Sequence, residues 1–145
     1  MVELMITISI IGVLAVLSLP AYGKFTQNWK LGGEADQFAG VLRAARAAAV
    51  MRNIDVVFTF NKTNGTYSYF EDRDRDGVHD NNEYRSSVYR FTPGIVISAF
   101  TLPGQTLIFG SMGNTKDSGS ITLRNTHDRT RTIRVFGGTG NVTVD

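Results

Sequence analysis

The sequence predicts an α+β fold in which a long N-terminal helix packs against antiparallel β-sheet. Apolar residues recur at helical spacing between residues 21 and 53, and strand-like alternation replaces that period from residue 54. The length of 145 residues suits one domain with one additional element. The absence of cysteine excludes a disulfide scaffold, a thiol nucleophile and a cysteine-ligated metal. The net charge of +2 argues neither for a strongly basic nucleic-acid-binding protein nor for an acidic tail.

The first element, residues 1–22, is almost uncharged. Its apolar stretch is about 20 residues long, which is enough to cross the hydrocarbon core of a bilayer. A secretory signal peptide is the competing interpretation, but no basic residue precedes Lys24, so the basic region of such a peptide is missing. We therefore expect residues 1–22 to form a transmembrane helix. Glu3 then lies either at the headgroup level or in a functional pair, because an unpaired carboxylate in lipid is costly.

The second element, residues 23–53, is expected to be an amphipathic helix that forms the spine of the domain. Its alanine-rich end has a high helix propensity. Gly32–Gly33 is expected to bend or break the helix, and Gly12 and Pro20 are further weak points. The apolar stripe that we expect to face the domain contains Tyr22, Phe25, Trp29, Phe38, Val41, Leu42, Ala45, Ala48 and Ala49.

The remaining residues, 54–145, are expected to form an antiparallel β globular domain. Eight segments rich in β-branched and aromatic residues are predicted to be strands. These segments are residues 54–60, 66–70, 84–91, 94–100, 105–110, 120–125, 130–136 and 141–145. Asn64-Gly65 predicts a two-residue hairpin turn between the first two strands.

One loop, residues 72–83, matches the EF-hand calcium-loop pattern at every position. Ca²⁺ prefers six to eight oxygen ligands, which alternate acidic residues supply as a loop wraps around the ion. The predicted ligands are Asp72, Asp74, Asp76, the Val78 carbonyl, Asp80 and Glu83. The alternative is a solvated acidic hairpin loop that Arg73 and Arg75 partly neutralise. We expect Ca²⁺ to be a cofactor, with a dissociation constant of roughly 10⁻⁴–10⁻³ M.

No pattern indicates catalysis. The sequence contains no P-loop, no HExxH and no recognisable Ser/His/Asp spacing. The two histidines, His79 and His127, are expected in loops, and the Gly-rich residues 137–140 are expected to form a hairpin turn. We therefore do not expect an enzyme.

Two groups of residues resemble a known family. Val2-Glu3-Leu4-Met5, the apolar run, Pro20 and Tyr22 are similar to the N-terminus of type IV pilins and type II secretion pseudopilins. Residues 37–57, 107–123 and 132–144 resemble the H-type pseudopilin and minor pilin (FimT-like) branch, whose Leu-x-x-Ala-Arg-x-x-Ala helix is matched from Leu42 to Ala49. The resemblance covers most of the chain.

The resemblance implies a structural subunit of a type II secretion pseudopilus or a type IV pilus. Its partners would be other pilin or pseudopilin subunits through helix packing, and an inner-membrane assembly platform. Glu3 and Pro20 would be assembly residues, with Glu3 pairing with the N-terminal amine of the neighbouring subunit. The protein would cross the inner membrane once, with its globular domain periplasmic, before it enters a periplasmic or cell-surface filament.

The start of the sequence departs from the family pattern. Met1 stands where the family has the Leu of a Phe-Thr-Leu segment, which follows a basic leader and a glycine. We hypothesise that Met1 is a misassigned start and that prepilin peptidase cleaves a leader encoded upstream, which would leave an amine for methylation. An upstream reading frame without such a leader would contradict this hypothesis.

Two alternative functions stay open at this point. The first is a DNA-binding minor pilin of a competence pilus, for which Arg124, Arg129, Arg131 and Arg134 are candidate nucleic-acid contacts. Strand alternation groups Arg129 with Arg131 but places Arg134 on the other face. Asn141 stands where such receptors carry arginine, and ordinary solvated strand faces explain the arginines equally well. The second alternative is the major pilin of a filament.

Overall fold

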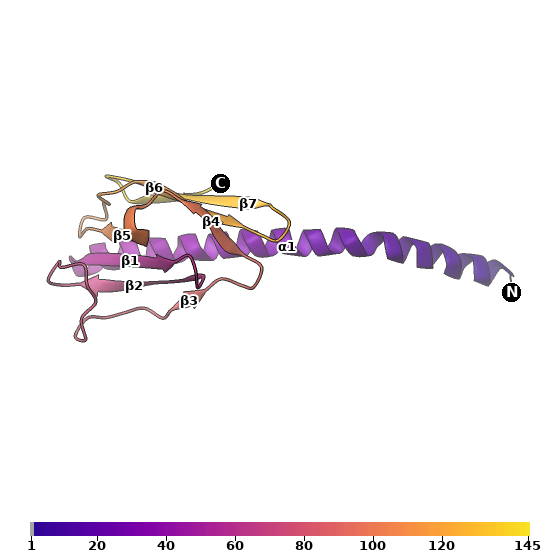
Figure 1. Ribbon diagram of the computed structural model, residues 1–145, viewed down its shortest axis with the longest axis horizontal. Coiled ribbons are helices and arrows are strands. Elements are labelled where there is room, and N and C mark those ends of the chain that lie inside the picture. Colours follow the sequence, from indigo (N-terminus) through magenta and orange to yellow (C-terminus); the bar gives the residue numbers. More distant parts are fainter. Residues whose placement is uncertain (1) are drawn as a thin grey trace.

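A single long helix organises the molecule. The computed structural model describes residues 2–145, except for the side chains of residues 17–21. Helix α1 (Val2–Arg52) projects from the domain with its N-terminal half and lies along the sheets with its C-terminal half (Figure 1). Among the described residues, no helix combines the length and the hydropathy needed to cross a membrane. Met1, and the side chain of Pro20 with its predicted role, lie outside the described residues.

Helix α1 continues through Gly32–Gly33, so the expected bend or break at these residues is wrong. A glycine costs a helix about 1 kcal/mol relative to alanine. Leu31, Ala35 and Phe38 are all buried against the domain on either side of the pair. Tertiary packing of this face outweighs the low propensity of the two glycines, as is usual for helices in proteins.

The strands form two four-stranded antiparallel sheets. The first has the order β3-β2-β1-β5 and the second β4-β6-β7-β8. The strands are β1 (Asp55–Asn61), β2 (Thr66–Asp72), β3 (Tyr89–Arg90), β4 (Val96–Phe100), β5 (Thr106–Phe109), β6 (Gly119–Arg124), β7 (Thr130–Phe136) and β8 (Asn141–Val144), with a short 3₁₀ turn, η1 (Pro103–Gln105), before β5. All eight predicted strands are present in the expected order.

Two local predictions in the first sheet need correction. The segment 84–91 forms only the short strand β3, because the Ser86 hydroxyl accepts the Tyr69 N–H at 3.0 Å, in place of a backbone carbonyl. The β1–β2 connection contains the four residues 62–65 rather than two, since Asn61 pairs directly with Thr66. Its last residue, Gly65, has a φ of +61°, a conformation that glycine adopts readily.

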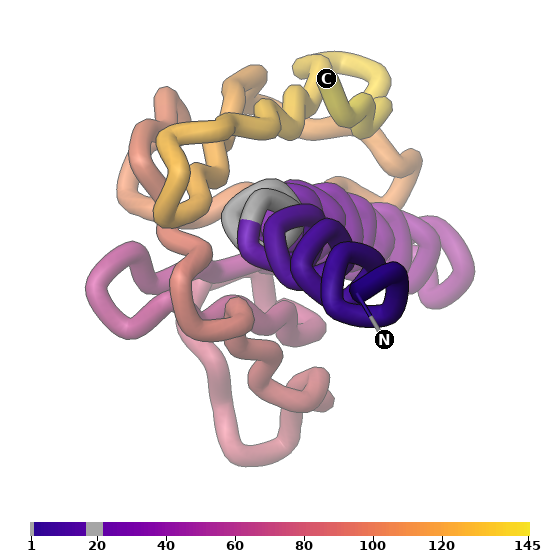
Figure 2. The backbone as a smooth tube through the Cα atoms, turned by 90° about the vertical axis from the view of Figure 1, so that its right-hand side faces the viewer, coloured from indigo at the N-terminus to yellow at the C-terminus, as the bar shows by residue number. Residues whose placement is uncertain are grey.

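The core lies where α1 meets both sheets. Figure 2 shows the helix between the orange-to-yellow strands and the magenta-to-pink strands. The helix contacts β1, β2 and β5 of the first sheet and β6, β7 and β8 of the second. Phe38 is fully buried, and its ring centroid lies 5.4 Å from that of Phe58, 4.8 Å from Tyr67 and 5.6 Å from Phe91. One helix thereby joins two sheets that share no strand.

The predicted apolar stripe is confirmed only in its C-terminal part. Phe38, Leu42, Ala45 and Ala49 are buried, as expected. The side chains of Tyr22, Phe25 and Trp29 are instead 70%, 58% and 72% exposed. The cause is the helical phase: at 100° per residue these three aromatics project from the side of α1 opposite the buried face.

Candidate metal centre

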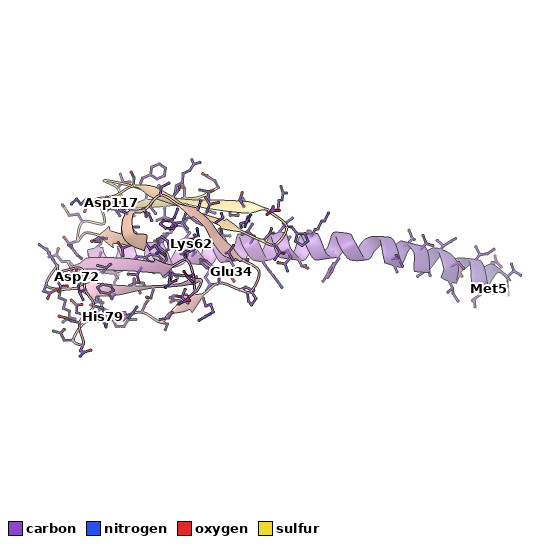
Figure 3. All side chains as sticks on the ribbon, viewed as in Figure 1. Met5, Glu34, Lys62, Asp72, His79 and Asp117 are labelled. Carbon is purple, nitrogen blue, oxygen red and sulfur yellow. The ribbon has the colours of Figure 1, made fainter. Side chains whose placement is uncertain are left out.

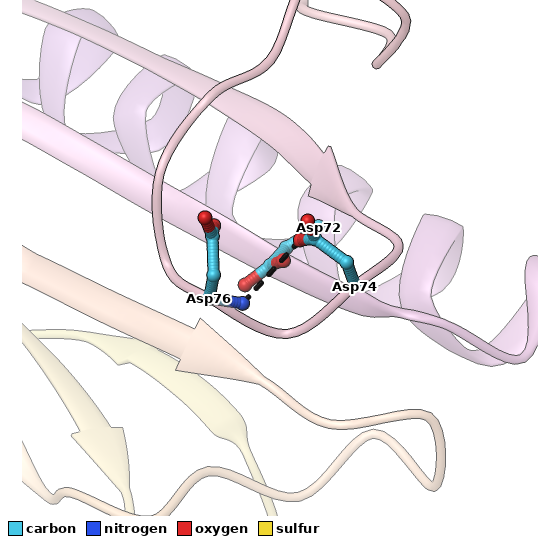
Figure 4. Close-up of side chains that lie close together, drawn as sticks. All are labelled: Asp72, Asp74 and Asp76. Atoms are coloured by element: carbon cyan, nitrogen blue, oxygen red, sulfur yellow. Dashed lines mark hydrogen bonds between the residues drawn. The ribbon is translucent and has the colours of Figure 1, made fainter.

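Three aspartates gather in the loop that follows β2. Figure 4 shows the side chains of Asp72, Asp74 and Asp76 close together there, and each supplies a carboxylate oxygen within 4.8 Å of those of the other two. Asp72 is the last residue of β2 and is buried, whereas Asp74 and Asp76 are exposed. Figure 3 places Asp72 and His79 at the opposite end of the molecule from Met5. The candidate metal centre is therefore remote from the N-terminal half of the helix.

The loop backbone orients these carboxylates. The Gly77 N–H donates to Asp72 Oδ2 at 2.9 Å, and the Val78 N–H donates to Asp76 Oδ1 at 2.7 Å. Gly77 has a φ of +77°, a conformation that glycine adopts readily and that allows a tight turn here. The alternating acidic residues are thus folded toward one another, as an oxygen-ligand site requires.

The clearest local indication of a cation site is at Asp72. Its side chain is only 2% exposed, and its Oδ1 atom has no hydrogen-bond partner among the described residues. Burial raises the pKa of the Asp72 carboxyl above its ordinary value, although backbone hydrogen bonds from Gly77 and Arg75 oppose the shift. A buried carboxylate oxygen without a partner is costly, and a bound divalent cation would offset that cost.

The other predicted ligands do not join the group of three aspartates. Both carboxylate oxygens of Glu83 accept backbone hydrogen bonds, from the Arg73 N–H at 2.7 Å and the Asp80 N–H at 3.0 Å. Glu83 therefore closes the loop, and Asp80 and Val78 are exposed. The structure brings together three of the six predicted ligands, and the full ligand set stays a prediction.

Glu71 anchors the loop to the helix, which the sequence pattern did not reveal. Its side chain is 1% exposed, and its Oε1 atom lies 2.5 Å from Nη1 of Arg52, in the last turn of α1. The Arg52 guanidinium also lies 5.5 Å from the ring centroid of Tyr84, whose carbonyl accepts the Glu71 N–H at 2.9 Å. Glu71 is followed by five further acidic residues in 72–83. Nothing in the sequence distinguishes it from them as the buried partner of Arg52.

The four candidate nucleic-acid arginines divide between two surfaces. Arg124 pairs with Asp128 and Arg134 pairs with Asp145, each at 3.2 Å, on the side of the second sheet away from the helix. Arg129 and Arg131 line a hollow of about 380 Å³ beside Asn28 of α1. The separation predicted from strand alternation is confirmed, and the four residues do not form one basic patch.

The last predicted site residue, Glu3, is exposed in the first turn of α1, and it forms no ion pair with any residue that the structure describes. Its neighbours on the helix are apolar and exposed as well. Within residues 2–145, this carboxylate therefore has no charged partner.

Sequence comparison identifies the family. The model described as type II transport protein GspH matches residues 34–139, from the C-terminal half of α1 to the β7–β8 turn. The chain belongs to the GspH family. Members of this family are pilin-like structural subunits, and membership implies assembly with other pilin subunits in a periplasmic filament. No curated protein sequence matches the chain at a significant level.

Solved structures agree with the GspH assignment at the level of the fold. The minor pseudopilin EpsH of the Vibrio cholerae type 2 secretion system has a TM-score of 0.64 at 13% identity, covering 80% of this chain and 96% of EpsH. The type IV minor pilin FimU of Pseudomonas aeruginosa PAO1 has a TM-score of 0.64 at 15% identity, covering 83% of this chain and 92% of FimU. The predicted α+β pilin-like fold is confirmed, and the chain is a pseudopilin or minor pilin structural subunit.

Proposed function

We propose that this GspH-family protein is held in the bacterial inner membrane by residues 1–22 and then enters a type II secretion pseudopilus or a type IV pilus through α1. The apolar side chains of its N-terminal half support the proposal, because Ile6, Ile8, Ile11, Val13 and Leu14 are each more than half exposed. An apolar helix of this kind requires lipid or other helices around it. An inner-membrane assembly platform would move the subunit from lipid to filament, and the chain itself would perform no catalysis.

Glu3 is the residue on which we expect this assembly to depend. In lipid or in a dry filament core, an unpaired carboxylate is costly, and pairing with the N-terminal amine of a neighbouring subunit would remove that cost. We expect Glu3→Ala and Glu3→Gln to abolish incorporation into filaments while the protein still reaches the membrane. Immunoblots of sheared filaments and of membrane fractions measure the two quantities separately.

The matched control for Glu3 is Asp36→Ala, which removes an exposed carboxylate farther along the same helix. This variant should assemble like the unmodified protein. Filaments that contain Glu3→Ala at the normal level would contradict the role of Glu3. Loss of both variants from the membrane fraction would instead point to a defect in insertion or stability.

We also propose that Ca²⁺ binds the loop of residues 72–83 and stabilises the domain. The three clustered aspartates and the unpartnered Oδ1 atom of Asp72 support this proposal. Asp72, Asp74 and Asp76 would hold the ion, and the Val78 carbonyl, Asp80, Glu83 and water would complete its coordination after the loop adjusts. Figure 3 places Asp72 and His79 at the end of the molecule remote from Met5, and periplasmic Ca²⁺ would reach the loop there.

Calorimetric titration of the full-length protein in detergent tests the calcium proposal. We expect a dissociation constant of roughly 10⁻⁴–10⁻³ M at pH 7.5, as in extracellular modules. The burial-raised pKa of Asp72 makes protons compete with the ion, so binding should weaken as the pH falls. Asp76→Asn should remove the heat of binding, whereas Asp36→Asn should retain it. The same heat in Asp76→Asn, or none in the unmodified protein, would contradict the site.

The two alternative functions have different readouts. The separation of the four arginines gives no support to a DNA-binding minor pilin, which would show steeply salt-dependent retardation of DNA in a mobility-shift assay. A major pilin would dominate the protein content of purified filaments. We favour a minor subunit, since both similar structures named above are minor components.

A further inference from the structure

Three exposed aromatic residues lie on one side of α1 where the helix leaves the domain. Tyr22, Phe25 and Trp29 project into solvent, and the ring centroids of Phe25 and Trp29 are 5.9 Å apart. They directly follow the apolar stretch of residues 1–22. Tyrosine and tryptophan are enriched at membrane–water interfaces, because one part of the ring is apolar and another can form a hydrogen bond.

Basic side chains lie at the same end of the domain. Figure 1 shows the connection between β6 and β7 next to α1, at the end of the domain that faces the N-terminus. Asn125 Nδ2 of this connection donates to Asn28 Oδ1 of the helix at 3.1 Å, which fixes its position. Arg129 lines one hollow with Arg131 and a neighbouring one with Lys24, and both hollows include Asn28, so the three cations lie close to the helix near residue 28.

The charges at this end favour an anionic partner. Lys24, Arg129 and Arg131 form no ion pair within the described part of the chain, whereas Arg124 and Arg134 are paired. Of the nearby acids, Asp128 pairs with Arg124. Two acids form no ion pair among the described residues: Glu34, which accepts the Thr92 N–H, and Asp36, which lines a hollow with Trp29 and Arg131. The unpaired cations therefore outnumber the unpaired acids.

We propose that this end of the domain, which we call the collar (Tyr22, Lys24, Phe25, Trp29, Arg129 and Arg131), docks on an anionic phospholipid surface before the subunit is assembled. The proposal rests on the membrane role proposed above for residues 1–22. From Tyr22 to Trp29 the helix rises about 10 Å. The headgroup layer on each side of a bilayer is roughly 5–8 Å thick. The rise slightly exceeds this thickness, so Tyr22 and Phe25 lie within the headgroup layer, Trp29 lies at its outer edge, and the three cations bind lipid phosphates.

Trp29 provides the test, because it is the only tryptophan in the chain. The full-length protein is reconstituted into vesicles of phosphatidylcholine alone or with about 30% phosphatidylglycerol, which gives the bilayer surface a negative potential. With phosphatidylglycerol at low salt, we expect a blue shift of Trp29 emission and weaker quenching of Trp29 by acrylamide, a neutral water-soluble quencher. Arg129→Gln/Arg131→Gln should lose most of the phosphatidylglycerol-dependent change. The matched control Lys116→Gln/Arg134→Gln removes two exposed cations outside the collar and leaves the Arg124–Asp128 pair intact, so it should keep the change.

Flotation of the vesicles at high salt separates the two proposals. A chain that does not float with the lipid contradicts the membrane role of residues 1–22, and the collar with it. A chain that floats, but whose Trp29 emission is indifferent to phosphatidylglycerol or responds equally in both double variants, overturns the collar alone. The collar proposal is also overturned if the Trp29 emission maximum changes with the protein-to-lipid ratio and not with lipid charge. That result would show that a second copy of the protein covers the aromatic face.

Discussion

Phe38→Ala should lower the free energy of unfolding by about 3–5 kcal/mol, the range for truncating a fully buried phenylalanine. Phe38 lies on α1 and contacts the aromatic rings of Phe58 and Tyr67 in the first sheet. It also contacts Phe91, which lies in the connection between the two sheets. Its removal leaves a cavity where helix and sheet meet, and the surrounding rings are too large and too constrained to fill it by small adjustments.

Urea unfolding of the full-length protein in detergent, followed by the near-ultraviolet circular dichroism of the tyrosines, measures this loss. Phe25→Ala is the matched control, because it removes the same side chain from the same helix at an exposed position. Its effect should be within about 0.5 kcal/mol, as for most surface substitutions. Similar midpoints for the two variants would contradict the buried position of Phe38.

The fold follows from the periodicity of the sequence to a large extent. Alternation located all eight strands, because a half-buried strand must place apolar side chains on one face. Alternation does not state which strands pair. The division into two sheets, with β5 beside β1 and β4 beside β6, is a long-range outcome of packing both sheets against α1.

The helix shows where local signals fail. Tyr22, Phe25 and Trp29 have helical spacing, but spacing alone does not state which side of α1 faces the sheets. The buried side is determined by Leu31, Ala35 and Phe38, and the three aromatics are out of phase with it. Similarly, Gly32–Gly33 has a low helix propensity, but Leu31 and Ala35 on either side are buried against the domain, and the helix continues.

The candidate metal centre was predictable in part, because three aspartates in alternate positions before a glycine constitute a local motif. The roles of Glu83 and Glu71 were not predictable, because both depend on contacts that form only in the folded protein. Glu83 accepts backbone hydrogen bonds that exist only once the loop has closed. Glu71 is buried against Arg52, which lies 19 positions earlier in the chain. The order of charges along the sequence does not predict which acidic residue pairs with this arginine.

Arg52→Met should therefore destabilise the domain although Arg52 is half-exposed. The substitution keeps much of the apolar stem but leaves the buried Glu71 carboxylate without its close partner. Breaking a fully buried pair costs about 3–5 kcal/mol. Because Arg73 Nη2 remains 3.7 Å from Glu71 Oε2, we expect a loss of about 2–3 kcal/mol in urea unfolding.

A double variant separates the effect of leaving the Glu71 carboxylate unpaired from the effect of losing the packing of the Arg52 side chain. Adding Glu71→Gln to Arg52→Met should recover part of the stability, because a neutral amide is less costly to bury than an unpaired carboxylate. Arg73→Met, which removes only the more distant cation, should have a small effect. If Arg52→Met were as stable as the unmodified protein, the ion pair would not hold the loop. Because Glu71 immediately precedes Asp72, we expect Arg52→Met also to weaken Ca²⁺ binding, since the loop would then have to order itself without its anchor on the helix.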